Sequence, residues 1–171
     1  MIISLTGFMG CGKSSVGKEL AGLLSFRFID LDRYVEHKAG KNIPDIFRED
    51  GEERFRALEA EAVRDVIIMS QITGEDLVLA LGGGTLSISS VRGFILGNTS
   101  CIYLKAELED CLKWIGERNS RPMLNRSGKE IRELFEERTK LYENAPFCID
   151  VTENGYKETA ESIIGKLRLN R

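Results

Sequence analysis

An eight-residue loop near the start of the chain constrains the fold more than any other feature. Residues 7–14 read Gly-Phe-Met-Gly-Cys-Gly-Lys-Ser, which matches the pattern GxxxxGK[ST], and they follow a short, mainly apolar run at residues 2–5. In such a loop the glycines let consecutive backbone N–H groups turn toward phosphate oxygens, a lysine reaches the β and γ phosphates, and a hydroxyl ligates Mg²⁺. The sequence therefore predicts a nucleotide site with Lys13 and Ser14 in these two roles.

A helix is predicted directly after the loop. Val16, Leu20, Leu23 and Leu24 recur at helical spacing, so the positive end of the helix dipole would point at the bound phosphates. The alternative is a glycine-rich turn that matches by chance; the fixed length, the Lys-Ser ending and the flanking elements argue against it. The candidate nucleotide-binding residues of the loop are Gly10, Cys11, Gly12, Lys13, Ser14 and Ser15.

The composition is that of an ordinary globular protein. The chain has 171 residues, enough for one domain of ordinary size, with 42% hydrophobic residues and a formal net charge of -3, which gives no sign of a nucleic-acid partner. Neither the N-terminus nor any later run has the length and apolar character of a leader or a membrane span, so we expect a cytoplasmic protein. Cys11, Cys101, Cys111 and Cys148 are too widely spaced for a zinc site and are expected to be reduced thiols.

Apolar runs bounded by turn residues predict five strands, at residues 2–5, 26–29, 77–81, 100–104 and 147–151. Helical patterns separate them, so the strands need crossover connections, which give a mainly parallel sheet with helices on both faces and ligands at the carboxyl ends of the strands. The predicted fold class is therefore α/β, a three-layer α/β/α sandwich of the P-loop type. The arginine-rich, weakly apolar segment at 117–126 is expected to form a lid.

Two carboxylates follow the second predicted strand. Phe26, Phe28, Asp30 and Asp32 alternate along it, and strand residues two apart share a face, so both carboxylates are expected to project together beside the loop. We interpret Asp30 as a support for Mg²⁺, directly or through water, and Asp32 as the group that acts on the hydroxyl attacking the γ-phosphate. The alternative is that Asp32 caps a helix beginning at Arg33, which leaves the pair unexplained.

Three consecutive glycines, Gly82, Gly83 and Gly84, follow the third predicted strand, where many phosphate-loop proteins carry an acidic metal partner. Because these residues have no Cβ, a ligand can approach the backbone closely, and its carboxylate or hydroxyl can accept N–H hydrogen bonds. A strand-to-helix turn is the alternative, but such a turn usually needs only one or two glycines. We therefore favour a binding role.

Two arginines are candidates for binding a carboxylate. Ser127 and Glu130 have capping-box spacing, and Arg138 falls in the apolar stripe of the helix that follows, so its guanidinium is directed inward and needs an anionic partner. A buried ion pair with a protein carboxylate is the competing explanation. Arg56 has Glu59 three residues further on to orient it. Together with the glycines, the arginines would suit an acceptor bearing a carboxylate, because guanidinium groups bind carboxylates bidentately.

Several motifs occur together along nearly the whole chain. In order they are Gly-Phe-Met-Gly-Cys-Gly-Lys-Ser, Phe-Ile-Asp-Leu-Asp, Phe-Arg, Leu-Gly-Gly-Gly, Arg-Pro-Met-Leu, and Arg followed by Leu-Tyr. The loop alone is shared by many families, but in this combination the sequence resembles the shikimate kinases. The resemblance implies a kinase related in fold to the nucleoside monophosphate kinases, with residues 1–171 as a single domain, a lid at about 117–126 and an acceptor-binding helical region at about 33–62.

The resemblance also implies the reaction. A shikimate kinase transfers the γ-phosphoryl group of MgATP to the 3-hydroxyl of shikimate, giving shikimate 3-phosphate on the route through chorismate to the aromatic amino acids. ATP is then the co-substrate and Mg²⁺ the cofactor. Small members of the family are often monomers, so we expect a monomer with no nucleic-acid or membrane partner.

The family's functional residues carry over to positions of this chain. The implied catalytic residues are Lys13, Asp32 and Arg121. Arg118 and Arg121 join the loop as ATP-binding residues, while Ser14 and Asp30 serve the metal. The implied substrate-binding residues are Asp32, Phe47, Phe55, Arg56, Gly82, Gly83, Gly84 and Arg138.

The sequence departs from the family pattern in places that concern the nucleotide. Met123 replaces a usual leucine in the Arg-Pro motif, and fewer residues than usual precede that motif around Arg118, the expected adenine-stacking residue. Glu153 and Asn154 stand where the family often places residues against adenine, and neither is basic. Trp114 is expected to pack in the core or at the hinge of the lid.

Two other functions are considered. A gluconate-type small-molecule kinase is expected to have a loop richer in serine and to lack the triple glycine. A non-catalytic ATP-binding regulator would be signalled by loss of Lys13, Asp32 or Arg121, and all three are present.

Overall fold

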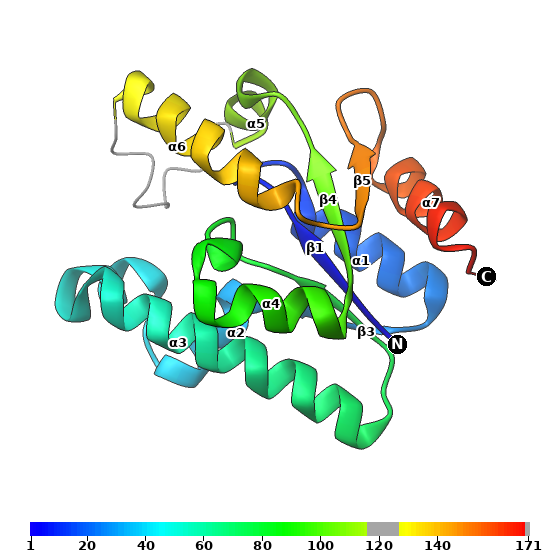
Figure 1. The fold of residues 1–171 in the computed structure, drawn as a ribbon, viewed down its shortest axis with the longest axis horizontal. Helices are drawn as coiled ribbons and strands as arrows, with labels where there is room; N and C mark the ends of the chain where they lie inside the picture. The colour runs from blue at the N-terminus through cyan, green and yellow to red at the C-terminus, as the bar shows by residue number, and fades with distance from the viewer. Residues whose placement is uncertain (116–126, 170–171) are drawn as a thin grey trace.

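A five-stranded sheet forms the centre of the computed structural model, which describes residues 1–115 and 127–169 (Figure 1). The strand order is β2-β3-β1-β4-β5, and all four pairings are parallel. The strands are β1 (Ile2–Thr6), β2 (Arg27–Asp30), β3 (Leu77–Ala80), β4 (Ser100–Lys105) and β5 (Phe147–Asp150). Each lies within one residue of a predicted strand, so the α/β prediction is confirmed.

Helices cover both faces of the sheet. They are α1 (Lys13–Leu24), α2 (Leu31–Ala39), α3 (Ile43–Thr73), α4 (Ser89–Asn98), α5 (Leu108–Ile115), α6 (Gly128–Tyr142) and α7 (Tyr156–Leu167), with a 3₁₀ turn, η1, at Thr85–Ser87. Helices α1 and α7 pack together on one side, and α3 packs with α4 on the other (Figure 1). The chain moves from β1 to β2 in one direction across the sheet and from β3 to β4 in the other, so right-handed crossovers place α1 and α4 on opposite faces.

The core follows from this layering. Strand β1 lies in the middle of the sheet, and all five of its residues are buried, as expected for a parallel strand covered by helices on both faces. Its Ile3 and Leu5 have no solvent exposure, and neither have Leu79 of β3 and Ile102 of β4. The apolar run before the phosphate-binding loop is therefore the centre of the core, and it holds the loop on a rigid element.

Three chain segments of the predicted site meet at one edge of the sheet. The carboxyl end of β1 leads into the loop, that of β2 into Asp30, and that of β3 into the triple glycine. The backbone N–H of Leu81 donates to the carbonyl of Leu5 at 3.0 Å, which extends the pairing of β3 with β1 up to the first glycine. Because parallel strands end at the same edge, residues far apart in sequence become neighbours.

Helix α3 bends at Gly51, where φ is 82° and ψ is 169°. No Cβ-bearing residue adopts this conformation readily, so the glycine divides α3 into a short first part and a long second part. The first part carries Phe47 and the second carries Phe55, and the bend brings the centroids of the two rings to 4.8 Å.

The proposed lid at 117–126, with Arg118, Arg121 and Met123, lies outside the described residues. Within the part of the chain that the structure describes, no helix has both the length and the apolar character needed to cross a membrane.

Candidate active site

The loop holds its lysine in place through backbone carbonyls. Gly7, Gly10 and Gly12 have φ values of 146°, 88° and 91°, a region that L side chains rarely adopt. Lys13 is buried, and its Nζ donates to the carbonyl oxygens of Gly7 at 2.8 Å and Phe8 at 2.9 Å. The ammonium group therefore lies inside the turn of the loop.

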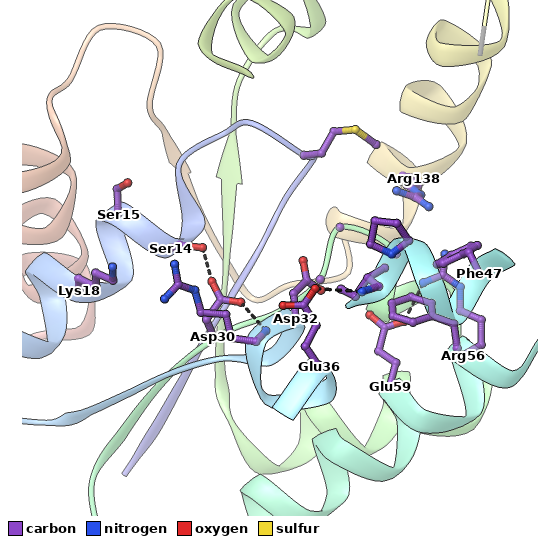
Figure 2. Close-up of a pocket in the computed structure, with 18 residues that line it drawn as sticks. Ser14, Ser15, Lys18, Asp30, Asp32, Glu36, Phe47, Arg56, Glu59 and Arg138 are labelled. Atoms are coloured by element: carbon purple, nitrogen blue, oxygen red, sulfur yellow. Dashed lines mark hydrogen bonds and ion pairs between the residues drawn. The ribbon is translucent and has the colours of Figure 1, made fainter. Parts of the chain in front are cut away.

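Ser14 and Asp30 form the oxygen pair expected at a Mg²⁺ site. The Ser14 hydroxyl donates to Oδ2 of Asp30 at 2.5 Å (Figure 2). The described residues contain no group of three or more His, Cys, Asp or Glu that could hold a metal by themselves. Two hard oxygen ligands nevertheless fit Mg²⁺, which usually keeps several waters and takes only one or two protein ligands together with substrate phosphates.

The expectation that Asp30 and Asp32 share one face of a strand is wrong. Strand β2 ends at Asp30, and Oδ1 of this residue accepts a hydrogen bond from the backbone N–H of Arg33 at 3.3 Å, so Asp30 is the N-cap of α2. Asp32 lies in the first turn of α2, and the alternative that it caps a helix beginning at Arg33 is also wrong. An aspartate at the N-cap stabilises the start of a helix, so α2 begins directly after Asp30. The alternation of side chains along the strand therefore ends before Asp32. Both carboxylates still line the same space.

A cleft of about 470 Å³, here called the larger cleft, opens at this edge of the sheet (Figure 2). The predicted substrate-binding residues all line it: Asp32, Phe47, Phe55, Arg56, Gly82, Gly83, Gly84 and Arg138. A smaller cleft of about 120 Å³ lies against the loop residues Gly10, Gly12 and Lys13. The two clefts share Ser14, Ser15, Asp30 and Asp32. They therefore meet beside the carboxylate pair.

The triple glycine lets charged side chains approach the backbone. A Cβ added to Gly82 would stand 2.5 Å from Oε1 of Glu59 and 2.9 Å from Oδ1 of Asp32. A Cβ added to Gly84 would stand 2.5 Å from Nη1 of Arg56. All three distances are shorter than real Cβ contacts, so Gly82 and Gly84 must be glycine for the side chains around them to keep their places.

Glu59 is a residue of the cleft that the sequence presented only as an orienting partner of Arg56. Its side chain is 1% exposed. It accepts hydrogen bonds from Nη1 of Arg56 at 2.7 Å and from the hydroxyl of Thr85 at 2.5 Å. The spacing of Arg56 and Glu59 signalled the pair, but the contribution of Thr85 from η1 had no sequence signal, because it depends on the return of the chain after β3.

Arg138 and Tyr142 bring α6 against the triple glycine. Arg138 is 6% exposed and lines the larger cleft, and Figure 2 shows it above Arg56 and Glu59. One turn further on, the Tyr142 hydroxyl donates to the carbonyl of Gly83 at 2.5 Å. Burial raises the pKa of Tyr142 far above its ordinary value, although Arg138 acts in the opposite direction, so the phenol remains a neutral donor. Nothing in the sequence analysis indicated this contact between Tyr142 and Gly83.

The two clefts suit ligand groups of different chemistry. The smaller cleft presents the loop with its lysine, which suits phosphate, and the adjoining larger cleft presents the guanidinium groups of Arg56 and Arg138, which suit a carboxylate. Asp32 stands where the two clefts meet. Such a site can bring a hydroxyl of an anionic small molecule to a phosphoryl group held on the loop.

Comparison with known proteins identifies the family. The family model described as "Shikimate kinase" matches residues 9–168. The chain is 41% identical over 169 residues to a shikimate kinase of Thermus thermophilus, covering 96% of this chain and 89% of that protein. It is 39% identical over 166 residues to a shikimate kinase of Persephonella marina, covering 97% of this chain and 98% of that one.

Solved structures agree with this result. The shikimate kinase of Acinetobacter baumannii in complex with shikimate superposes with a TM-score of 0.90 at 31% identity, over 98% of this chain and 92% of that one. The shikimate kinase of Aquifex aeolicus gives a TM-score of 0.84 at 32% identity, over 98% and 96%. A deoxyadenosine kinase from M. mycoides with bound dATP shares only the fold, at 16% identity and a TM-score of 0.67. On the sequence match over almost its whole length, the chain belongs to the shikimate kinase family.

Proposed function

We propose that this protein transfers the γ-phosphoryl group of MgATP to the 3-hydroxyl of shikimate, giving shikimate 3-phosphate. The observation that carries the proposal is that the cleft against the loop and the cleft lined by Arg56 and Arg138 share Asp32. Membership of a family of ATP-dependent phosphotransferases supports it. The proposal includes one kinase domain over residues 1–171, with its acceptor-binding helical region at about 33–62, acting as a cytoplasmic monomer without nucleic-acid or membrane partners.

At the nucleotide end, the loop N–H groups and Lys13 would bind the phosphates of ATP, and Ser14 and Asp30 would hold Mg²⁺. The metal, when bound, neutralises negative charge that develops on the transferred group. The Lys13 ammonium, already held inside the loop by two carbonyl oxygens, acts on the same charge without reorganising. Arg118 and Arg121, which lie outside the described residues, are proposed to act on the nucleotide from the lid segment.

At the acceptor end, Arg56 and Arg138 would hold the shikimate carboxylate, with the ring against the Phe47 and Phe55 pair and the remaining hydroxyls against the triple glycine. Glu59 fixes the guanidinium of Arg56 through the 2.7 Å hydrogen bond. Anchoring the far side of the acceptor leaves one hydroxyl at Asp32, whose carboxylate would take its proton as the oxygen attacks the γ-phosphate. Positioning therefore supplies most of the expected rate enhancement.

A coupled assay of ADP release tests the proposed function. MgATP is supplied with shikimate, with gluconate or with no acceptor at equal concentrations. We expect turnover with shikimate well above both controls, because gluconate lacks the ring that would pack against the two phenylalanines. Equal, slow ADP release in all three reactions would contradict the proposal, and faster turnover with gluconate would favour the alternative kinase.

A further inference from the structure

A buried carboxylate lies behind the guanidinium of Arg56. Glu59 is 1% exposed, and both of its carboxylate oxygens accept a hydrogen bond: Oε2 from Nη1 of Arg56 at 2.7 Å and Oε1 from the hydroxyl of Thr85 at 2.5 Å. A carboxylate removed from water has to be hydrogen-bonded, and a donor on each oxygen prevents the group from rotating. The two donors together therefore set the direction in which Glu59 holds Arg56.

The Thr85 hydroxyl has one proton and two acceptors within reach. Its Oγ1 is 2.5 Å from Oε1 of Glu59 and 3.0 Å from the carbonyl oxygen of Gly82. The same carbonyl already accepts the backbone N–H of Thr85 at 3.1 Å, so it does not depend on the hydroxyl. Because the carboxylate is charged and closer, the hydroxyl donates to Glu59.

Thr85 lies behind the larger cleft and not in its wall. Its side chain has no solvent exposure and is not among the side chains that line the cleft, whereas Arg56 and Glu59 are. A Cβ added to Gly82 would stand 2.5 Å from Oε1 of Glu59 and 3.1 Å from Oγ1 of Thr85, so the two oxygen atoms meet in the space that the glycine leaves open. Thr85 can therefore affect a ligand only through the residues that it contacts.

The attachment to Glu59 is the firmer of two that hold Arg56. Nη2 of Arg56 is also 3.2 Å from Oε1 of Glu52, but the Glu52 side chain is 54% exposed, and an exposed ion pair of this kind constrains a guanidinium little. A guanidinium binds a carboxylate bidentately only when its planar group faces the ligand, so a small rotation of Arg56 costs affinity. The orientation of Arg56 thus depends on Glu59, and that of Glu59 on Thr85.

We propose that Thr85 is a positioning residue for the acceptor: its hydroxyl fixes the Glu59 carboxylate, which in turn directs the Arg56 guanidinium at the acceptor's carboxylate. Thr85 comes from η1, the turn that follows the triple glycine, so the segment that shapes the cleft also aligns a side chain of α3. This inference rests on the proposed function in taking Arg56 as a ligand of the acceptor carboxylate.

Thr85→Val tests the role of the hydroxyl, because valine keeps the shape of the side chain and cannot donate. We expect the KM for shikimate to rise by about tenfold, while kcat and the KM for ATP stay within about twofold of the unchanged protein. Thr85→Ser keeps the donor and should restore a KM for shikimate within about twofold. Thr85→Ala removes the hydroxyl without adding an apolar group and should give the same increase as Thr85→Val, which guards against a folding defect of one variant.

Ser87→Ala is the matched control from the same turn. The Ser87 hydroxyl donates to the carbonyl of Gly84 at 2.5 Å, and this carbonyl also accepts the backbone N–H of Ser87 at 3.0 Å. The arrangement repeats that of Thr85 with Gly82, except that the described contact of the Ser87 hydroxyl is with a carbonyl and not with a carboxylate. Ser87→Ala should therefore leave the KM for shikimate within about twofold of the unchanged protein.

A double-mutant cycle shows whether Thr85 acts through Glu59. In a Glu59→Gln background, adding Thr85→Val should change the KM for shikimate by less than about twofold, because the carboxylate that the hydroxyl fixes is already absent. An unchanged KM for shikimate in Thr85→Val, an equal increase in Ser87→Ala, or a full tenfold effect of Thr85→Val in the Glu59→Gln background would each overturn the proposal.

Crystal structures of Thr85→Val and Ser87→Ala without ligands separate this inference from the proposed function. We expect the Arg56 guanidinium to leave its position against Glu59 in Thr85→Val and to keep it in Ser87→Ala. If the unchanged protein does not phosphorylate shikimate but Arg56 moves in Thr85→Val alone, the proposed function fails and the positioning of Arg56 by Thr85 stands. If shikimate is phosphorylated and Thr85→Val changes neither the KM for shikimate nor the position of Arg56, the positioning role fails alone.

Discussion

At the scale of single residues, the glycines that follow β3 have different neighbours. These neighbours are the charged side chains of the site. Gly82 faces Glu59 and Asp32, and Gly84 faces Arg56, at distances that leave no room for a methyl group. The requirement for glycine therefore comes from side chains that arrive from α2 and α3. Backbone conformation is a smaller factor, because Gly84 has a φ of -108°, which any residue can adopt.

Gly84→Ala should therefore impair acceptor binding and also lower the free energy of unfolding. The new methyl group displaces the Arg56 guanidinium from Glu59, and the buried carboxylate loses a charged donor, which costs about 1–3 kcal/mol of stability. A guanidinium that is out of place binds the acceptor carboxylate poorly, so the KM for shikimate should rise by about tenfold or more. Steady-state kinetics and a thermal melt measure the two effects. Gly97→Ala is the control, because nothing lies within 4 Å of a Cβ added at Gly97 in α4. An unchanged KM for shikimate in Gly84→Ala would show that Arg56 does not hold the acceptor.

At the scale of secondary structure elements, α6 is attached to the site at its C-terminal end. A capping box of Ser127 and Glu130 starts the helix, as the sequence predicts. At the other end the Tyr142 hydroxyl binds the carbonyl of Gly83, and Arg138 lies one turn before it. The position of the buried guanidinium thus depends on a hydrogen bond between two elements that are 59 residues apart in sequence.

Tyr142→Phe should lower the free energy of unfolding by about 1–3 kcal/mol, because the buried carbonyl of Gly83 loses its donor while the ring still fills its space. Urea denaturation at neutral pH measures this change. Tyr156→Phe is the control for stability: its side chain is 55% exposed, and removing its hydroxyl should change stability by less than about 0.5 kcal/mol. Equal stability of Tyr142→Phe and the unchanged protein would mean that water replaces the lost donor.

At the scale of the whole molecule, the three-layer core buries several groups that ionise at alkaline pH. Burial raises the pKa of Cys101 to about 11 and those of Cys111 and Tyr103 to about 12. The folded protein keeps these protons at pH values where the unfolded chain has already lost them. The stability that they contribute is therefore complete below the pKa of a thiol in the unfolded chain, about 9, and is lost as the pH rises toward the folded values.

The free energy of unfolding should accordingly fall from about pH 9 upward, by at most about 1.4 kcal/mol per pH unit for each such group. Urea denaturation at a series of pH values measures the slope. Cys101→Ala should lower stability at neutral pH but flatten the decline between about pH 9 and about pH 11, because the variant has lost one of the groups. Identical slopes for the variant and the unchanged protein would show that Cys101 does not ionise on unfolding in this range.

Local pattern alone determined much of this protein. The loop motif, the five strands within one residue, the capping box and the pairing of Arg56 with Glu59 all depend on residues that are close in sequence. Parallel connectivity also placed Asp32 and the triple glycine at one edge of the sheet, whereas Phe47 and Phe55 were implied only by the family resemblance. All of the predicted substrate-binding residues line the larger cleft. Motif spacing and hydrophobic periodicity are therefore enough to predict the structure wherever contacts between residues close in sequence determine it.

Only the tertiary structure decided the rest. The sequence put Asp30 and Asp32 on one strand face, whereas a cap at Asp30 starts α2 and a turn of helix brings Asp32 to the same cleft. Thr85 beside Glu59, and Tyr156 against the loop, are contacts between segments whose meeting depends on the order of the strands and the faces that the helices cover. Such contacts leave no periodic trace in the sequence, because they form only when the whole core has packed.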